Sequence, residues 1–318
     1  MAEKTVRLAL IGAGGMANAV HYPSLKEIEG VELIAICDLV EQKRVETAKR
    51  FGIPKVYADY REMLDKEACD AVYVLMPPHH LYDITVDVLR RKKHVFIEKP
   101  PALTRFQTES LARIARENNC ITMTGFNRRH IPVLVHAKNE VESTGRITQV
   151  VATFYKRAPA AYYNGAIDAL TCDAIHAVDA LRWMAGSEAA RVACVEGQFD
   201  DVVPNSWNAV IQFENGVTGV LLTNWSVTAR VHTFEIHGLG ASAFVVPEEE
   251  TRIYKSGERV SVTSEQLTGR KEHHANYGFL DEARHFIACV RSGTQPTSNF
   301  DDAAKTMALV ERIRQSAI

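Results

Sequence analysis

The sequence predicts an α/β protein with two parts: a doubly wound sheet of parallel strands, then an α+β domain with a large, mostly antiparallel open sheet. Two observations carry this prediction. Short apolar runs alternate with helical patterns over the first 124 residues, as in repeated βαβ units. Beyond that point, runs rich in Val, Thr, Phe and Ile follow one another with turn signals between them. We therefore expect two domains, residues 1–124 and 125–318.

Five apolar runs are expected to form the parallel sheet. Each run is nearly continuous, which is typical of strands that are buried on both faces. The helical patterns between them, such as residues 39–51 and 82–93, are long enough for right-handed crossover connections. The predicted strands are residues 6–12, 31–38, 71–76, 94–100 and 120–126.

The second domain is expected to combine a few helices with many strands. An apolar pattern that starts near Ile131 predicts a helix. Turn signals divide the stretch from Arg191 to Val262 into successive strands, which is typical of an antiparallel sheet. The other predicted elements are a strand at 147–157 and helices at 173–185, 279–293 and 303–315.

Composition and charge narrow the class of protein. Apolar residues make up 46% of the chain and charged residues 24%, and no apolar stretch is long enough to span a bilayer. The formal net charge of −2 gives no field that would attract nucleic acid or an anionic membrane. The six cysteines form no CxxC pair and no histidine cluster has metal-ligand spacing. We therefore expect no metal, a small-molecule partner and a cytoplasmic location.

A glycine-rich turn follows the first predicted strand and opens a helix. In the sequence GAGGMA, Gly12 would make the tight turn, Gly14 would let the backbone approach a pyrophosphate, and Ala17 would allow the helix to pack closely. The pyrophosphate would bind at the helix N-terminus, where unpaired N–H groups favour an anion. We expect a dinucleotide to contact Gly12, Gly14, Gly15 and Met16, and a tight turn without a ligand is the alternative.

Asp38 closes the second predicted strand, about twenty residues beyond the glycine turn. A carboxylate there can accept hydrogen bonds from the adenosine ribose hydroxyls, and its charge would repel the 2′-phosphate of NADP. NAD is therefore the expected cofactor, although Lys43 and Arg44 leave NADP open. The alternative is that Asp38 caps the following helix.

Five motifs together resemble the Gfo/Idh/MocA oxidoreductase family, over nearly the whole chain. They are GAGGMA, LMPPHH at 75–80, EKP at 98–100, GFNRR at 125–129 and DAIHAVDALRWM at 173–184. The run CDAIHAVDALRW is most similar to MviM-like members. The resemblance implies an NAD(P)-dependent oxidoreductase that acts on the alcohol or ketone of a sugar, an inositol or a related compound.

The same resemblance implies more about the two domains. The first would be a Rossmann domain, with further nucleotide contacts from Pro77, His80, Glu98 and Lys99. The second would bind substrate and, through its open sheet, form a homodimer or homotetramer. The predicted sheet is also larger than one layer of helices can cover, which favours such an assembly.

Lys99 is a candidate catalytic residue. Because the residue before a proline is held extended, Pro100 would fix the backbone at the end of the fourth strand, where open α/β sheets bind ligands. A lysine there can donate to a substrate hydroxyl or carbonyl, and desolvation would lower its pKa. The alternative is a surface lysine paired with Glu98.

His176 is the second candidate, because the pKa of imidazole lies near neutrality and oxidation of an alcohol must release a proton. On a helix, Asp173 and Asp179 would share its face. The family motif places an aspartate four residues before the histidine, where this chain has Cys172, so Asp173 either replaces it or that role is lost.

A second departure from the family concerns the turn after the third strand. Where the family commonly has a histidine, this chain has Leu81, and His79 and His80 are offset from that position. We therefore expect no catalytic role for these two histidines.

Several polar residues are candidate substrate contacts beside Lys99 and His176. Tyrosine and asparagine offer hydrogen bonds and flat apolar faces to a hydroxylated ring, and arginine suits a carboxylate or phosphate. These candidates are Asn127, Arg128, Tyr155, Arg157 and Tyr163. The alternative function is a non-catalytic dinucleotide-binding sensor, and a third is a lyase or hydrolase that uses bound NAD transiently.

Overall fold

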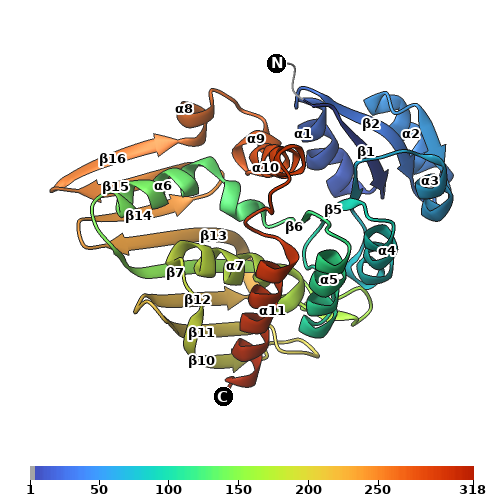
Figure 1. Cartoon of the computed structure of the whole chain (residues 1–318). Coiled ribbons are helices and arrows are strands. Elements are labelled where there is room, and N and C mark those ends of the chain that lie inside the picture. The colour runs from blue at the N-terminus through green and yellow to red at the C-terminus, as the bar shows by residue number, and fades with distance from the viewer. Residues whose placement is uncertain (1–3) are drawn as a thin grey trace. The chain divides into compact units, whose positions relative to one another are not determined.

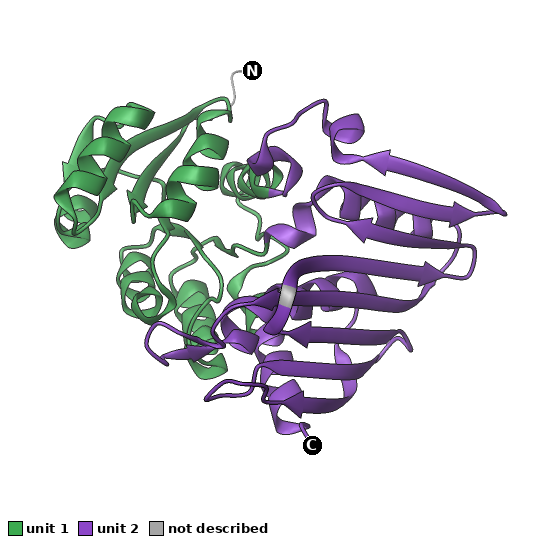
Figure 2. Cartoon of the chain, turned by 180° about the vertical axis from the view of Figure 1, so that it is seen from behind, with its two compact units in different colours: residues 1–126, 279–304 green, residues 127–278, 305–318 purple. Residues whose placement is uncertain are grey.

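The computed structural model describes residues 4–318, except for the side chain of Thr228. The chain forms two compact units, which Figure 2 distinguishes by colour. Unit 1 comprises the residues up to Phe126 together with Phe279–Ala304, and unit 2 comprises Asn127–Gly278 together with Lys305–Ile318. The first division lies close to the expected boundary after residue 124. Residues 279–304, which were expected in the second domain, belong instead to unit 1.

Unit 1 contains a six-stranded parallel sheet in the order β3-β2-β1-β4-β5-β6. This is the strand order of the doubly wound Rossmann fold, so the predicted fold of the first domain is confirmed. All five predicted strands form, and β3 was missed because it has no buried apolar run. The strands are β1 (Val6–Ile11), β2 (Val31–Cys37), β3 (Lys55–Tyr57), β4 (Ala71–Val74), β5 (His94–Ile97) and β6 (Thr122–Thr124).

Helices cover both faces of this sheet (Figure 1). Because successive residues of a strand point to opposite faces, Leu8 and Leu10 join a core with α1, α2 and α10. Ala9 and Ile11 join a second core with α3, α4 and α5. The helices of this unit are η1 (Ala17–His21), α1 (Tyr22–Lys26), α2 (Glu41–Phe51), α3 (Tyr60–Lys66), α4 (Pro78–Arg90), α5 (Arg105–Glu117) and α10 (Phe279–Ser292).

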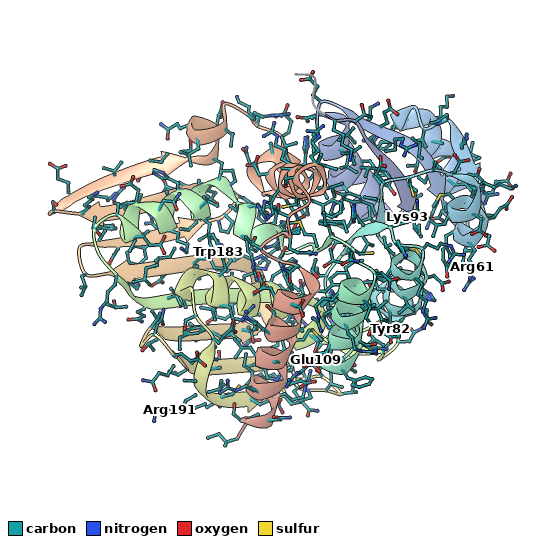
Figure 3. All side chains as sticks on the ribbon, viewed as in Figure 1. Arg61, Tyr82, Lys93, Glu109, Trp183 and Arg191 are labelled. Carbon is teal, nitrogen blue, oxygen red and sulfur yellow. The ribbon has the colours of Figure 1, made fainter. Side chains whose placement is uncertain are left out.

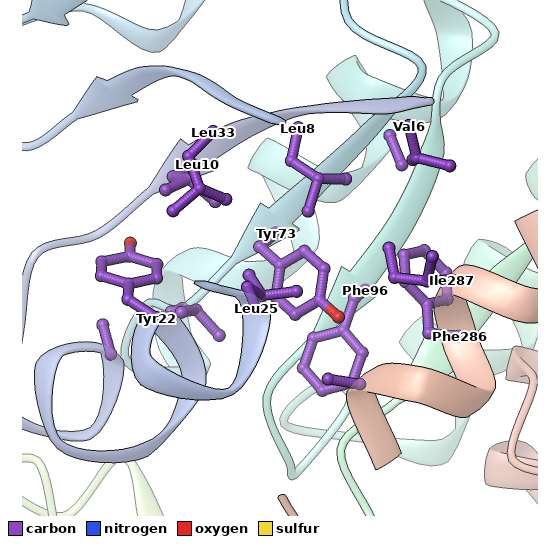
Figure 4. Close-up of a cluster of buried hydrophobic side chains, with 14 of the residues drawn as sticks. Val6, Leu8, Leu10, Tyr22, Leu25, Leu33, Tyr73, Phe96, Phe286 and Ile287 are labelled. Atoms are coloured by element: carbon purple, nitrogen blue, oxygen red, sulfur yellow. The ribbon is translucent and has the colours of Figure 1, made fainter. Parts of the chain in front are cut away.

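An aromatic cluster explains why α10 belongs to unit 1. Figure 4 shows Phe286 and Ile287 of this helix beside Tyr73 of β4 and Phe96 of β5. The rings of Tyr73 and Phe96 stack with centroids 4.5 Å apart, and Phe286 meets both rings edge-on at 5.6 and 5.8 Å. Stacked and edge-on pairs are the favoured arrangements of aromatic rings. The helix therefore buries its apolar face in the first core, although it follows the strands of unit 2 in sequence.

Unit 2 is built on an eight-stranded sheet in the order β10-β11-β12-β7-β13-β14-β15-β16. The strands β12 and β7 pair in parallel and the other neighbours pair antiparallel, so the predicted mostly antiparallel sheet is confirmed. The strands are β7 (Ile147–Arg157), β10 (Ala189–Gly197), β11 (Ser206–Phe213), β12 (Thr218–Asn224), β13 (Ser226–Gly238), β14 (Ala241–Val246), β15 (Glu250–Lys255) and β16 (Glu258–Thr263). A small hairpin of β8 (Ala161–Tyr162) and β9 (Ile167–Asp168) follows β7.

The helix α7 is buried along most of its length against this sheet. Trp183, labelled in Figure 3, is partly exposed on it, and the Lys138 ammonium lies 5.5 Å from the centre of its ring. The helices of unit 2 are η2 (Asn127–His130), α6 (Pro132–Glu142), η3 (Leu170–Ala174), α7 (Ile175–Ala185), α8 (Ser264–Thr268), α9 (His273–Asn276) and most of α11 (Phe300–Gln315). Between residues 4 and 318, no helix has both the length and the apolar character that crossing a membrane requires.

The side chains of β7 alternate between the two faces of the sheet, which decides what each can contact. Val150, Ala152 and Phe154 are at most 1% exposed and lie on the face that α7 covers. Lys156 shares this face because it follows the same alternation. Tyr155 and the exposed Arg157 lie on the opposite face.

Candidate functional site

Candidate nucleotide-binding residues follow the ends of four strands of unit 1. Gly12 follows β1, Asp38 follows β2, Pro77 comes after β4, and Glu98 follows β5. The carboxyl ends of parallel strands meet at one edge of a sheet, and open α/β sheets bind their ligands there. These sequence-predicted residues are therefore gathered at one edge of the unit 1 sheet.

The glycine turn has the shape that a dinucleotide requires. Gly12 has a φ of +105°, and a Cβ atom there would overlap the carbonyl oxygen of Leu75. At Gly14 and Gly15, by contrast, an added Cβ atom would meet nothing within 4 Å. A helical segment begins at residue 15, and the side chain of Met16 is 52% exposed. The N–H groups of this helix start therefore border open space that a pyrophosphate can enter.

Asp38 is tied to the glycine turn. Its Oδ2 accepts a hydrogen bond from the Ala13 N–H at 2.8 Å, and its Oδ1 accepts one from the Val40 N–H at 2.8 Å. The helix α2 starts at Glu41 with Val40 at its N-cap, so the alternative that Asp38 is the cap is wrong. Each carboxylate oxygen retains a lone pair for a further donor, as a ribose hydroxyl would need. Arg44 donates to the Asp38 carbonyl at 3.3 Å, which places a cation beside this acid.

The start of α4 explains the departure from the family at residue 81. Leu81 is fully buried in the second core of unit 1. His79 and His80 are exposed, with ring centroids 4.1 Å apart, and the His80 N–H donates to the Pro77 carbonyl at 2.9 Å. Leu81 therefore has a packing role, and His80 remains a candidate cofactor contact.

Glu98 is paired with a histidine that the sequence analysis missed. Nε2 of His21 lies 2.6 Å from Oε1 of Glu98, and Oε2 of Glu98 accepts the Lys99 N–H at 3.0 Å. His21 is 1% exposed and meets the rings of Phe96 and Phe279 edge-on, both at 5.5 Å. The only signal for this residue in the sequence was a lone histidine a few residues after the glycine turn.

This pair fixes the charge of Glu98. Burial alone would raise the pKa of this carboxyl, but the hydrogen bond and charge of His21 outweigh it and hold the pKa below its usual value. Lys99 follows directly, and its peptide bond to Pro100 is cis. The backbone N–H of Lys99 is therefore held by the charged, partly buried carboxylate of Glu98.

In unit 2, Asp173 is the centre of a polar cluster. Its carboxylate forms an ion pair with Lys156, and the Tyr162 hydroxyl donates to its Oδ2 at 3.5 Å. The Trp225 indole N–H donates to the Tyr162 hydroxyl at 3.2 Å. Burial would lower the pKa of Lys156, but the charge of Asp173 raises it, and burial with the same charge raises the pKa of Tyr162. In the structure, the ionic partner of Asp173 is therefore Lys156, a residue that the sequence analysis did not choose as a candidate.

His176 lies in the first turn of α7 and is 5% exposed. Asp179, one turn further along, accepts a hydrogen bond from Arg129 Nε at 2.8 Å and from Thr306 Oγ1 at 2.9 Å. Because Asp179 is fully buried, this ion pair leaves its charge compensated. Asp179 therefore ties α7 to η2.

Arg128 follows η2's first residue and is 6% exposed. Its Nη1 donates to Asn127 Oδ1 at 2.7 Å, and its guanidinium lies 4.4 Å from the ring centre of Tyr277. The other end of the Asn127 amide donates to the Tyr277 carbonyl at 2.8 Å. Asn127 is 1% exposed and its amide bridges Arg128 and the Tyr277 carbonyl, so in this structure it positions Arg128.

Three further candidate substrate contacts lie outside the Asp173 cluster. Tyr155 and Arg157 lie on the face of β7 opposite Lys156, so strand alternation separates them from the Asp173 cluster. Tyr163 is at the turn of the β8–β9 hairpin with a φ of +51° and is 45% exposed, whereas its neighbour Tyr162 meets Asp173. Within residues 4–318, no three His, Cys, Asp or Glu side chains are grouped so that they could hold a metal ion.

A Rossmann sheet with an open glycine turn in one unit and an open, mostly antiparallel sheet in the other are the features of a nucleotide-dependent oxidoreductase. Comparison with known families agrees. Residues 6–126 match the family described as "Oxidoreductase family, NAD-binding Rossmann fold", and residues 137–243 match the "GFO/IDH/MocA C-terminal domain". The chain belongs to the Gfo/Idh/MocA oxidoreductase family, as its motifs predicted.

Individual relatives agree with this membership. The chain is 26% identical to myo-inositol 2-dehydrogenase of Thermotoga maritima, over 96% of this chain and 94% of the relative. It is 25% identical to scyllo-inositol 2-dehydrogenase (NAD(+)) of Bacillus subtilis, over 95% and 91%. Among solved structures, a dehydrogenase (MviM) from Clostridium difficile superposes with a TM-score of 0.86 at 21% identity, covering 98% of this chain and 100% of that chain.

Proposed function

We propose that this chain is an NAD-dependent dehydrogenase or reductase for the alcohol or ketone of a sugar, polyol or sugar derivative. The observation that carries the proposal is the open space at Gly14 and Gly15, on the same sheet edge that presents Lys99. The two inositol dehydrogenases among the relatives support a polyol-like substrate. When bound, NAD would supply the hydride acceptor for oxidation of the carbinol carbon.

The residues of the chain have to hold the substrate and move a proton. Oxidation of C–OH to C=O breaks the C–H bond with its electron pair and releases the hydroxyl proton to a base. We assign these tasks to Lys99 and His176: one accepts the proton and the other holds the oxygen by a hydrogen bond. Lys156 and Asp173 are proposed to bind substrate hydroxyls, since their opposite charges are paired and their cluster offers both donors and acceptors.

The test is a nicotinamide absorbance assay against a panel of inositols, aldoses and sugar acids. Turnover of at least one group of these substrates with NAD is the expected result. Tight binding of NADH with no turnover across the panel would favour the sensor alternative. Product formed without net change in the cofactor would favour the lyase or hydrolase alternative.

We also propose a homodimer or homotetramer that forms through the open face of the unit 2 sheet. Val210, which is 54% exposed, lies on this face beside Val220, and Phe244 packs edge-on against Tyr254 there. Such an apolar patch is typical of an interface. Sedimentation should show an assembly that Val210→Glu weakens, and a monomer at every concentration would refute it.

A cytoplasmic location is the accompanying proposal. All six cysteines are buried thiols, which suits a reducing compartment. Fractionation of the producing cells should recover the protein with cytoplasmic markers, and recovery from the periplasm or medium would contradict this.

A further inference from the structure

Arg128 is a buried cation that lacks an anionic partner. It is 6% exposed, and among residues 4–318 it forms no ion pair with a carboxylate. Its hydrogen bond to Asn127 uses Nη1 alone, and Nε is buried without a hydrogen-bond partner. Burying an uncompensated charge is costly, so a ligand that neutralises it would be strongly favoured.

The direction in which Arg128 is held limits what that ligand can be. With Nη1 on Asn127, the edge formed by Nε and Nη2 has no hydrogen-bond partner within the described chain. This edge presents two parallel N–H donors, the geometry that binds both oxygens of a carboxylate. Tyr277 supports the guanidinium from one side with its ring, and is itself 4% exposed.

The residues around Arg128 supply further hydrogen-bond donors, but no negative charge that is left over to balance Arg128. Arg230 lies 3.5 Å from the Tyr277 hydroxyl, but its charge is matched by Glu248 at 3.1 Å. His232 stacks on Phe154 with ring centroids 4.0 Å apart. Burial, with the charges of Arg128 and Arg230, lowers the pKa of His232 to about 3, so this ring is neutral at physiological pH.

The group of Arg128, Arg230, His232 and Tyr277, here called the arginine cluster, carries one unmatched positive charge after Glu248 is counted. The buried Nδ1 of His232 also has no hydrogen-bond partner. His232 pairs with Phe154 across β13 and β7, on the face of the sheet that also carries Lys156, so the arginine cluster adjoins the Asp173 cluster within unit 2. A substrate bound by the Asp173 cluster can therefore lie close to the arginine cluster.

We infer that the substrate carries a carboxylate, which binds side-on to Nε and Nη2 of Arg128, with His232 and Arg230 as neighbouring donors. The inference rests on the proposed function and narrows its substrate class from sugars and polyols in general to sugar acids. A phosphate has the same sign of charge, but one unmatched cation and one two-donor edge fit a singly charged, planar group better.

The test compares substrates that differ only in this group. The specificity constant kcat/KM is measured with NAD for D-glucose against D-glucuronate and D-galactose against D-galacturonate, with glucose 6-phosphate and myo-inositol as further arms. Charge-assisted hydrogen bonds predict a preference of about 10- to 100-fold for each uronate over its neutral partner. Equal or lower kcat/KM for the uronates would overturn the inference, and a preference for the phosphate would overturn the carboxylate assignment.

Variants test whether Arg128 causes the preference for uronates. Arg128→Gln should reduce the uronate-to-neutral ratio at least tenfold, mainly through KM, and Arg128→Lys should restore part of it, because a lysine keeps the charge but loses the two-donor edge. Arg157→Gln is the matched control, since Arg157 lies on the other face of β7, and it should leave the ratio unchanged. An unchanged ratio in Arg128→Gln would refute the role of this arginine.

Calorimetry separates this inference from the proposed function. D-glucuronate is titrated into the NADH-loaded wild-type protein and into Arg128→Lys. Binding that weakens in the variant supports the role of the arginine cluster even if no sugar is oxidised, in which case the proposed function fails alone. No binding of D-glucuronate to the wild type, with turnover of neutral sugars, would refute the role of the arginine cluster and leave the proposed function standing.

Discussion

His21 of the helix that follows the glycine turn and Glu98 at the end of β5 form a partly buried hydrogen-bonded pair, with Nε2 and Oε1 2.6 Å apart. The pair joins two segments that both belong to the candidate nucleotide edge. Because Glu98 also accepts the Lys99 N–H, a change at His21 should be transmitted to the backbone of Lys99.

The first prediction concerns this pair. His21→Leu should destabilise the fold by on the order of 3 kcal/mol, because it leaves a partly buried carboxylate without its partner. Lys66→Met, which breaks the exposed Lys66–Glu62 pair, is the control and should cost less than about 1 kcal/mol. Urea denaturation at pH 7 measures both. A loss in His21→Leu no greater than the control's would show that the pair contributes little.

The same pair has a pH dependence whose sign follows from Glu98. Its pKa in the folded protein lies below the unfolded value, which is about 4.3. The stabilisation is therefore complete above that unfolded value and is lost as the pH falls through the folded pKa. Denaturation of the wild type between pH 7 and pH 3 should show this loss, and the stability gap to His21→Leu should narrow over the same range.

The second prediction separates folding from nucleotide binding at the glycine turn. Gly14→Ala should fold normally, because its Cβ meets nothing within 4 Å, yet should weaken NAD binding by filling the space for the pyrophosphate. Gly12→Ala should instead lower the melting temperature, since its Cβ overlaps the Leu75 carbonyl and its φ is +105°. Calorimetry and thermal unfolding measure the two effects. Normal NAD affinity in Gly14→Ala would show that the pyrophosphate does not bind at this turn.

The parallel sheet was predictable because each of its main strands is a continuous apolar run, which reports burial on both faces. The assignment of α10 was not predictable, because a helix with an apolar stripe fits any core, and only the rings of Tyr73 and Phe96 determine which one it joins. The short β3 lacked a signal for the opposite reason, since its residues are largely exposed.

The site residues could be predicted where they belong to a sequence motif, but not where residues distant in sequence meet only in the folded structure. Gly12, Asp38 and Lys99 follow strand ends, so their common edge could be inferred from the order of elements. Lys156 was missed in favour of its two neighbours, because the sequence does not tell which face of a strand an adjacent helix covers. His21 likewise required the tertiary structure, since Glu98 is distant in sequence.

The third prediction concerns the choice of cofactor. Wild-type protein should bind NAD more tightly than NADP, because the Asp38 carboxylate repels a 2′-phosphate. Asp38→Asn should narrow this gap by removing the charge, and it retains an acceptor for the Ala13 N–H, which Asp38→Ala does not. Calorimetry with both nucleotides is the measurement. A wild-type preference for NADP would mean that Arg44, beside the Asp38 carbonyl, dominates this end of the site.

The last prediction concerns catalysis by Lys99 and His176. Lys99→Ala and His176→Asn should each lower kcat by roughly a hundredfold to ten-thousandfold, the usual range for loss of acid–base assistance, with NAD affinity nearly unchanged. Asp173→Asn should cost less, because it removes the charge that holds Lys156 but leaves both proposed proton-transfer groups in place. Lys93→Ala is the matched lysine control. Lys93 precedes β5, whereas Lys99 follows it, and the Lys93 ammonium donates to the Cys69 carbonyl at 2.8 Å. Turnover should therefore not change in Lys93→Ala. Steady-state kinetics with the best substrate of the panel, with calorimetric NAD binding, tests all four. Full turnover in His176→Asn would show that His176 has only a structural role. Full turnover in Lys99→Ala would show that Lys99 takes no part in the reaction.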